Sequence, residues 1–415
     1  MSFSAFGMRY FRRRGCPRQR TIAARPPLAQ TRPDTATMKQ VALLIETSNA
    51  YARGLLRGVV AYRREHTPWS LHLAEHGRGD RPPSWLATWR GDGILARIET
   101  PAMARALRRL KIPIVDLSAA RLIPALPWFE TDDAAIAQMA FEHLRDRGYR
   151  RFAYCGDARF NWSNWRGEHF QRAVTAEGSE CLAYQPAHRF RPDDAAQGDD
   201  LARWLRKLPK PIGIMACYDP LGRQLLDACR RAHIAVPDEV AVISVDNDEV
   251  LCELSHPPLT SVIPNTHRTG YEAAALLDEL MAGRPLHAET RLVLPIGIAA
   301  RQSTSALAIE DRRTALAVRF IREHACTGIN VADVLKAVPQ ARRLLESRFR
   351  RLLGRTPHEE ILHVQLTRVK QLLVETDLPL SEIAERAGFA HVEYLSVVFK
   401  RETGIPPSAY RRANR

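Results

Sequence analysis

The sequence predicts an α/β region followed by an all-α region. Two observations support this prediction. Between residues 41 and 262, apolar runs of about five residues alternate with longer segments of helical spacing, whereas a spaced pattern of Leu, Phe, Gly and Pro recurs after residue 304. The length of 415 residues fits two or three domains. With 45% hydrophobic and 26% charged residues, the composition is that of an ordinary globular protein.

Six apolar runs in the first region predict buried strands. Segments with helical spacing lie between them, for example residues 54–64, 134–147 and 221–233. This alternation predicts parallel sheets with helices on both faces, in which ligands bind beyond the carboxyl ends of the strands. The six runs are residues 41–45, 93–96, 113–117, 152–155, 212–217 and 240–245.

Polar residues follow these runs and form a candidate ligand site. An aromatic-rich segment, residues 156–170, is predicted to be a loop and adds further candidates. Aromatic rings stack on the apolar faces of sugars, while arginines and carboxylates bind hydroxyls. Helix capping, or packing between lobes, is the structural alternative for each residue alone. The candidate ligand-binding residues are Ser48, Asn49, Tyr51, Arg97, Asp132, Trp162, Trp165, Arg166, Tyr218, Asp219 and Asp246.

An internal repeat with an offset of fifty residues marks the tail. Leu345, Phe349, Gly354 and Pro357 recur as Leu395, Phe399, Gly404 and Pro407. Leu and Phe four residues apart bury one face of a helix, Gly then ends it in a left-handed conformation, and Pro prevents continuation.

The segment before each long helix predicts a helix-turn-helix unit. In the second unit we expect Ser381 to cap a short helix and Gly388 to form a tight turn. The first unit has Val338 and Pro339 in place of that glycine, so its turn is predicted to differ.

The helix faces opposite the repeated Leu and Phe are candidates for reading DNA. Arginine recognises guanine, glutamate accepts from cytosine, valine contacts the thymine methyl group, and terminal Lys and Arg suit phosphates. A solvated helix face is the alternative. The candidates are Arg342, Arg343, Glu346, Ser347 and Arg350 in the first unit, and His391, Val392, Glu393, Ser396, Val397, Lys400 and Arg401 in the second.

The distribution of charge supports a polyanionic partner. The formal net charge is +15, and the excess lies at the two ends of the chain. Residues 1–37 hold eight arginines against one acidic residue and are predicted to be a disordered basic extension upstream of a natural start at Met38. A DNA-gripping arm or a transit-like peptide are the alternatives. The seven cysteines form no C-x-x-C pair and are expected to be buried free thiols.

The middle of the chain resembles the effector domains of the LacI/GalR repressors. The resemblance rests on residues 237–247 (PDEVAVISVDN) and 258–262 (PLTSV), and covers residues 38–304. It implies a periplasmic-binding-protein-like fold of two α/β lobes with a sugar cleft between them. It also implies that Arg166 binds sugar hydroxyls, with Asp132, Tyr218, Asp219 and Asp246 at the cleft. Those repressors carry a helix-turn-helix before the sensor, which this chain lacks.

The tail, residues 305–415, resembles the AraC family of transcriptional regulators. The matching segments are 383–389 (IAERAGF) and 394–407 (YLSVVFKRETGIPP), followed by Tyr410 and Arg411. The resemblance implies two helix-turn-helix units joined by a helix, roughly residues 359–375, that enter successive major grooves of double-stranded DNA.

The order of these domains resembles that of the xylose operon regulators. This resemblance implies a cytoplasmic homodimer that senses a small sugar and activates catabolic genes with RNA polymerase at an operator or promoter. Arg97 stands where that family has an acidic cleft residue, which suggests an acidic or different sugar.

Other classes of protein are less compatible with the sequence. No P-loop, GxSxG or HExxH motif occurs, so we expect no catalytic residues, no metal, no cofactor and no enzyme activity. No apolar run is long enough for a membrane span. The alternative is a sugar-binding or sugar-processing α/β protein without a regulatory role.

Overall fold

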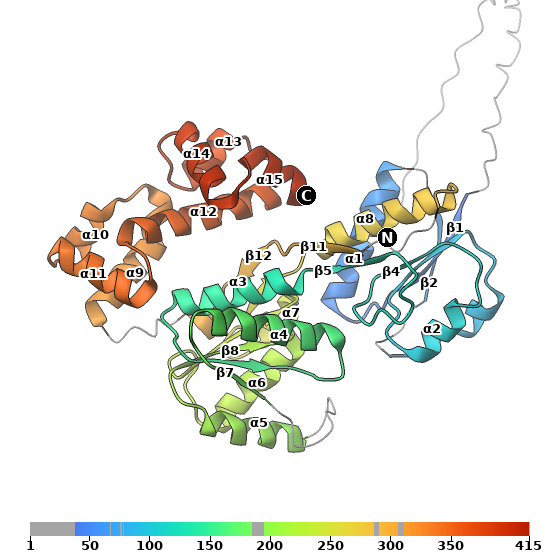
Figure 1. Ribbon diagram of the computed structural model, residues 1–415, viewed down its shortest axis with the longest axis horizontal. Helices are drawn as coiled ribbons and strands as arrows, with labels where there is room; N and C mark the ends of the chain where they lie inside the picture. Colours follow the sequence, from blue (N-terminus) through green and yellow to red (C-terminus); the bar gives the residue numbers. More distant parts are fainter. Residues whose placement is uncertain are drawn as a thin grey trace, which may run out of the picture. The chain divides into compact units, whose positions relative to one another are not determined.

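The computed structural model describes residues 38–66, 68–74, 77, 79–184, 195–285, 290–305 and 311–414. The basic extension predicted for residues 1–37 lies outside this part of the chain. The described residues form two α/β lobes followed by a helical region, as the sequence predicts (Figure 1). None of the described helices is long and apolar enough to cross a membrane.

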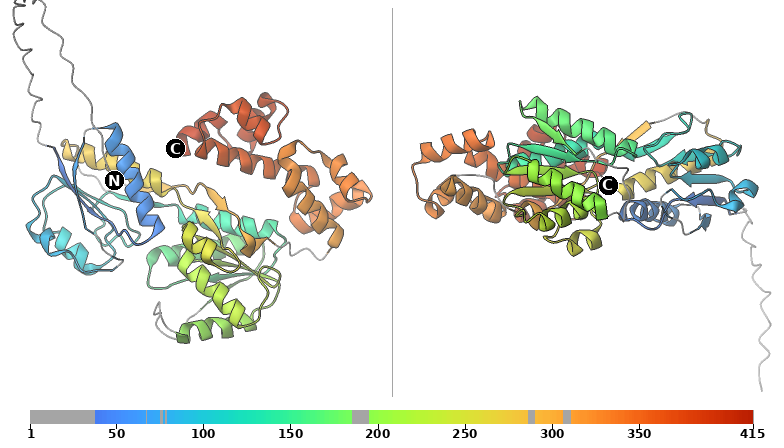
Figure 2. Two further views of the ribbon diagram at one scale, coloured as in Figure 1. Left: turned by 180° about the vertical axis from the view of Figure 1, so that it is seen from behind. Right: turned by 90° about the horizontal axis from the view of Figure 1, so that it is seen from below.

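The first lobe is built on a parallel six-stranded sheet in the order β11-β5-β4-β3-β1-β2. Residues of β1 alternate between its faces. Val41 and Leu43 pack in a core with α1 and α8, whereas Ala42 and Leu44 pack in a second core with α2. This alternation follows from the two-residue period of a strand and leaves both faces covered (Figures 1 and 2). Its elements are β1 Gln40–Leu44, α1 Ala50–Glu65, β2 Ser70–Leu73, η1 Ser84–Thr88, β3 Gly93–Ala96, α2 Pro101–Leu107, β4 Ile114–Asp116, β5 Trp128–Thr131, α8 Thr266–Met281 and β11 Thr290–Val293.

The second lobe contains a six-stranded sheet in the order β12-β10-β9-β8-β6-β7, which is parallel except for the edge strand β12. Helices α3 and α4 lie on one face and α5 and α6 on the other (Figure 1). Its elements are α3 Asp133–Asp146, β6 Phe152–Cys155, α4 Asn161–Ala176, β7 Cys181–Ala183, α5 Ala195–Lys207, β8 Ile212–Ala216, α6 Asp219–Arg231, β9 Val240–Val245, α7 Glu249–Leu254, β10 Thr260–Ile263, β12 Gly297–Ala299 and η2 Gln302–Thr304.

All six predicted strands are confirmed, with ends shifted by at most one residue. The aromatic segment is a correction, because most of the predicted loop is the start of helix α4. Its buried residues Trp162, Arg166, Phe170 and Val174 recur every four positions and cover one helix face. Aromatic density therefore marked a buried helix face rather than a loop.

The helical region contains two units, each with a core of its own. Gly354 and Gly404 end the long helix of each unit with φ of 72° and 78°, as predicted. Helix α12 joins the units and occupies residues close to those predicted (Figure 1). The elements are α9 Arg312–His324, η3 Ala325–Thr327, α10 Val331–Ala337, α11 Arg342–Leu353, α12 Pro357–Glu375, α13 Leu380–Arg386, α14 Val392–Thr403 and α15 Pro407–Asn414.

The prediction that Ser381 caps the short helix of the second unit is wrong. Helix α13 begins one residue earlier, at Leu380, and its N-cap is Pro379, which forms no side-chain cap bond. Pro379 is extended, with φ of −61° and ψ of 153°, and its side chain has no acceptor, so the helix begins without a side-chain cap. The turn that follows has the predicted left-handed glycine, Gly388, with φ of 79°. In the first unit, Val338 ends α10 with φ of −129°, so the two turns differ as predicted.

Candidate functional sites

A small cavity lies at the carboxyl ends of strands from both lobes. It is lined by Tyr51, Arg97 and Glu130 from the first lobe and by Trp162, Arg166 and Asp246 from the second. Five of these six residues belong to the ligand-binding set predicted from the sequence. Each lies just beyond or near the end of a strand, or on a helix that follows one, as the fold class predicts.

Arg97 is buried between carboxylates of its own lobe. Its Nη2 donates to Glu99 at 2.5 Å, and its Nη1 donates to Glu46. Burial alone would lower the pKa of Arg97, but the two carboxylates outweigh that effect and hold its pKa above the ordinary value. The Nε of Arg97 is buried and has no hydrogen-bond partner among the described residues.

Arg166, on helix α4 of the second lobe, is the other arginine of the cavity. Its Nε donates to Asp133 at 2.8 Å, its Nη2 lies 2.7 Å from the same carboxylate, and Nη1 donates to the carbonyl of Cys217. Burial would lower the pKa of Arg166, but Asp133 and Asp246 hold it above the ordinary value. Asp246 itself has a φ of 107°, a conformation rare for a residue with a side chain.

Glu130 is the carboxylate that the first lobe contributes to the cavity lining. The hydroxyl of Tyr51 donates to Glu130, and the backbone N–H of Thr131 donates to the same carboxylate at 2.9 Å. Burial, followed by the nearby charge of Asp133, raises the pKa of Glu130. The site therefore combines two paired guanidinium groups, several carboxylates and two aromatic rings, which can hydrogen-bond and stack on a small polar ligand.

The other predicted ligand residues have structural roles or lie beside the cavity. Asp219 is fully buried and accepts hydrogen bonds from Ser244, Ser261 and the backbone of Asp248, and burial raises its pKa to about 6. Asn49 and Asp132 cap helices α1 and α3. Among the rest, Tyr218 contacts the Trp162 ring, Trp165 contacts Trp128, and Ser48 is exposed.

Four carboxylates of the site are absent from the predicted set: Glu46, Glu99, Glu130 and Asp133. Glu46 and Glu99 closely follow strands, so their positions resembled those of the chosen residues. Glu130 lies inside β5, where all four residues are buried. A charged residue within an apolar strand is the signal that would have identified it.

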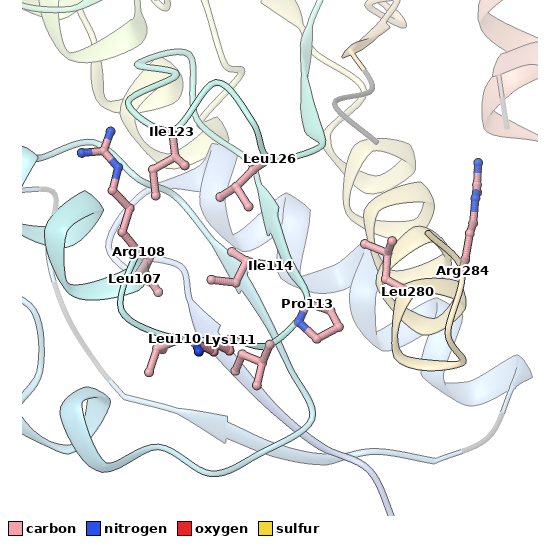
Figure 3. A pocket seen from close by; sticks show the side chains of 11 residues that line it. Leu107, Arg108, Leu110, Lys111, Pro113, Ile114, Ile123, Leu126, Leu280 and Arg284 are labelled. Carbon is pink, nitrogen blue, oxygen red and sulfur yellow. The ribbon is translucent and has the colours of Figure 1, made fainter. Parts of the chain in front are cut away.

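A larger hollow of about 480 Å³ lies elsewhere on the first lobe (Figure 3). Aliphatic side chains such as Leu107, Ile114 and Leu126 line it, and three cations, Arg108, Lys111 and Arg284, complete the lining. No carboxylate is among its lining residues. Ile114 is the first residue of β4, so this hollow lies at the amino ends of the strands. Its chemistry and position do not suit a sugar.

The second candidate site is the exposed face of helices α11 and α14. Leu345, Phe349 and Leu353 bury one side of α11, while Arg342, Arg343, Ser347 and Arg350 are exposed. Glu346 pairs with Arg342 at 2.9 Å. The sequence therefore places a basic, solvent-facing surface on the longer helix of the first unit, as predicted.

Helix α14 presents a more apolar surface. Val397 is 66% exposed, and His391, Glu393, Lys400 and Arg401 are also exposed. Two predicted residues are turned partly inward. Val392 packs against the core of the second unit, and the hydroxyl of Ser396 donates to the carbonyl of Val392 at 2.9 Å.

Two exposed apolar residues on these helices were not predicted. Leu344 is 42% exposed and Tyr394 is 49% exposed, and the offset of fifty places them at equivalent positions. Exposed apolar groups on a recognition helix suit thymine methyl groups. In the sequence, both could have been found as the apolar residues that directly precede the repeated Leu345 and Leu395.

No group of three or more His, Cys, Asp or Glu residues within the described residues has an arrangement that would hold a metal ion. Six of the seven cysteines lie in the described part, where all six are free thiols and four are buried, namely Cys155, Cys217, Cys229 and Cys252.

The domains of the chain match three known families. Residues 40–134 match the XylR N-terminal domain, residues 141–304 the periplasmic binding protein-like domain, and residues 334–413 a helix-turn-helix domain. Among solved structures, that of the xylose-binding transcription activator XylR shares 31% identity with a TM-score of 0.59, over 91% of this chain and 99% of that one.

Two curated relatives extend over nearly the whole chain. The xylose operon regulatory protein of Escherichia coli K12 is 32% identical over 90% of this chain and 97% of its own length. That of Haemophilus influenzae is 30% identical over 90% and 98%. These relatives are transcription regulators rather than enzymes, which excludes the alternative without a regulatory role. The chain belongs to the family of the xylose operon regulatory proteins.

Proposed function

We propose that the protein regulates transcription in response to a neutral sugar bound between its two lobes. One observation carries this proposal. The same chain contains a cavity lined by paired arginines and carboxylates and two helix-turn-helix units. The xylose named in its relatives makes pentoses the first ligands to test.

The pairing of Arg97 supports a neutral rather than an acidic sugar. From the sequence alone, Arg97 favours an acidic ligand, because it stands where the xylose operon regulators have an acidic cleft residue. In the structure its charge is offset by Glu46 and Glu99, and Glu130 and Asp246 also line the cavity. A carboxylate on the ligand would meet these acidic groups at short range, where like charges repel strongly.

The cavity must enlarge to hold a sugar. Its volume is only about 20 Å³, which is room for about one water molecule. A sugar ring is several times larger than this volume. The side chains that line the cavity, or the two lobes of the protein, therefore move apart when the ligand enters. A ligand that binds the two arrangements unequally shifts the population between them, and this shift is the proposed signal.

The output of this signal is binding to double-stranded DNA. Residues of α11 and α14 contact base edges, and their terminal arginines and lysines contact phosphates. The protein acts in the cytoplasm as a homodimer that activates catabolic genes through contact with RNA polymerase. Free buried thiols accord with a reducing compartment.

A thermal-shift screen tests the ligand class. Neutral pentoses and hexoses are compared with aldonic and uronic acids, and a true ligand raises the melting temperature through mass action. Arg166→Ala should abolish the shift, whereas Arg172→Ala on the exposed side of the same helix should retain it. Stabilisation by sugar acids alone would refute the proposal of a neutral ligand.

A further inference from the structure

The side chain of Gln365 connects the two helix-turn-helix units. Gln365 lies in the middle of α12 and is buried, with 5% exposure. Its Nε2 donates to the carbonyl of Ala325 at 3.0 Å and to the carbonyl of Gly388 at 3.0 Å. Ala325 belongs to η3 in the first unit, and Gly388 is the turn glycine of the second. One amide thus binds the backbone of both units.

The two units do not share an apolar core that would fix their orientation. The first core includes Ala325, Leu345 and Phe349, and the second includes Leu395 and Phe399. Helix α12 contributes to both, with Ile361 in the first core and Leu366 in the second. Apolar packing therefore stabilises each unit separately along helix α12, and the polar contacts of Gln365 join the backbone of the two units beside that helix.

Gly388 lies unusually close to the backbone of the first unit. A Cβ atom at this position would lie 2.7 Å from the carbonyl oxygen of Ala325 and 2.8 Å from both Cys326 C and Gly328 N. These distances are far below van der Waals contact, so only glycine allows this approach. The turn glycine thus serves the junction as well as the turn.

We infer that Gln365 is a positioning residue that fixes the angle and distance between the two recognition helices, and so sets the half-site spacing that the protein accepts on DNA. Recognition helices read two half-sites only when their separation matches the repeat of the duplex. A rigid junction selects one half-site spacing. DNA with a different spacing can bind only if the duplex bends or the contacts of the junction break, and both cost free energy. The inference rests on the proposed DNA-reading role of α11 and α14.

The main test variant is Gln365→Met, which keeps the length of the side chain and removes its amide. Gln371→Ala is the matched control, since Gln371 lies on the exposed side of the same helix. Gln365→Asn is a milder variant that is too short to reach both carbonyl groups. All are made in the full chain.

The first readout requires no DNA. Spin labels are attached through unnatural amino acids at Ser347 and Val397, which are exposed on α11 and α14. We expect a narrow distance distribution for the unaltered chain and Gln371→Ala, and a broad one for Gln365→Met. An intermediate width is expected for Gln365→Asn, so the test survives if the Met variant fails to fold. A narrow distribution in every folded Gln365 variant would overturn the inference.

The second readout measures spacing preference. A duplex selected by the unaltered chain from a randomised pool of about 40 base pairs is re-made with base pairs inserted between its half-sites. Gln365→Met should bind the selected duplex roughly tenfold more weakly, as expected if about one in ten of its loosened orientations fits that duplex, and should discriminate less between spacings. An unchanged spacing profile also overturns the inference. Failure of the unaltered chain to select any sequence would instead refute the proposed DNA reading, and the label distances would still decide the role of Gln365.

Discussion

Arg97 and Glu46 form an ion pair in which each side chain is only 4% exposed. The pair exists because β1 and β3 are neighbours in register, with Leu44 opposite Ala96, so the residues after their ends emerge together. This pair offsets the charge of Arg97 beside the cavity between the lobes.

Replacing Arg97 by Ala should destabilise the first lobe by about 3–5 kcal/mol, because it leaves the buried carboxylates of Glu46 and Glu99 without their cation. The measurement is urea denaturation without ligand. Arg223→Ala removes a cation from an exposed pair with Asp227 and should cost less than about 1 kcal/mol. Equal small effects would show that the buried pair contributes little.

Asp116 should make stability depend on pH. Burial raises its pKa to about 7 from an ordinary value of 3.8. The folded chain therefore holds this proton up to a higher pH than the unfolded chain, so the contribution of Asp116 to stability falls as pH rises from about 4 to about 7. Asp116→Asn should remove roughly 4 kcal/mol of this pH dependence at most. Denaturation at pH 5 and pH 8 measures most of it, and we expect the variant to gain stability relative to the parent at both pH values, by roughly 3 kcal/mol more at pH 8 than at pH 5.

The close approach of Gly388 can be separated from its φ angle. Gly404 has a similar φ of 78° but open space around it, whereas Gly388 has a φ of 79° and backbone atoms within 2.8 Å of the place that a Cβ atom would take. Gly404→Ala should cost about 1–2 kcal/mol from the left-handed conformation alone. Gly388→Ala should cost about 1–3 kcal/mol more because of the clash. Equal destabilisation in thermal unfolding would argue against a tight junction.

Phosphate contacts and base contacts on α14 should differ in their salt dependence. Lys400→Ala should weaken binding to all sequences and reduce the slope of log affinity against log salt by about one. Glu393→Ala should instead change the preferred base at one position, by about 1–3 kcal/mol. Arg230→Ala, which removes one exposed charge from the second lobe, is the control for net charge. The assignments fail if all three variants lower affinity alike.

The order of the α/β and helical regions and most of the secondary structure follow from local patterns in the sequence. Alternating apolar runs predicted six strands, and the offset of fifty residues located both helix-turn-helix units, because hydrophobic periodicity is a local property of the chain. Five of the six residues that line the cavity between the lobes also belong to the set predicted from the sequence, because that set was taken from the ends of parallel strands.

Tertiary structure decided what these residues do. Only the register of β1 and β3 brings Glu46 to Arg97 and turns a lone cation into a neutralised pair. Only folding places the carbonyl groups of Ala325 and Gly388, 63 residues apart in sequence, within reach of one amide. Such pairings depend on long-range contacts that no local pattern encodes, which is why Asp219 was predicted as a ligand residue and is found as a buried hydrogen-bond acceptor.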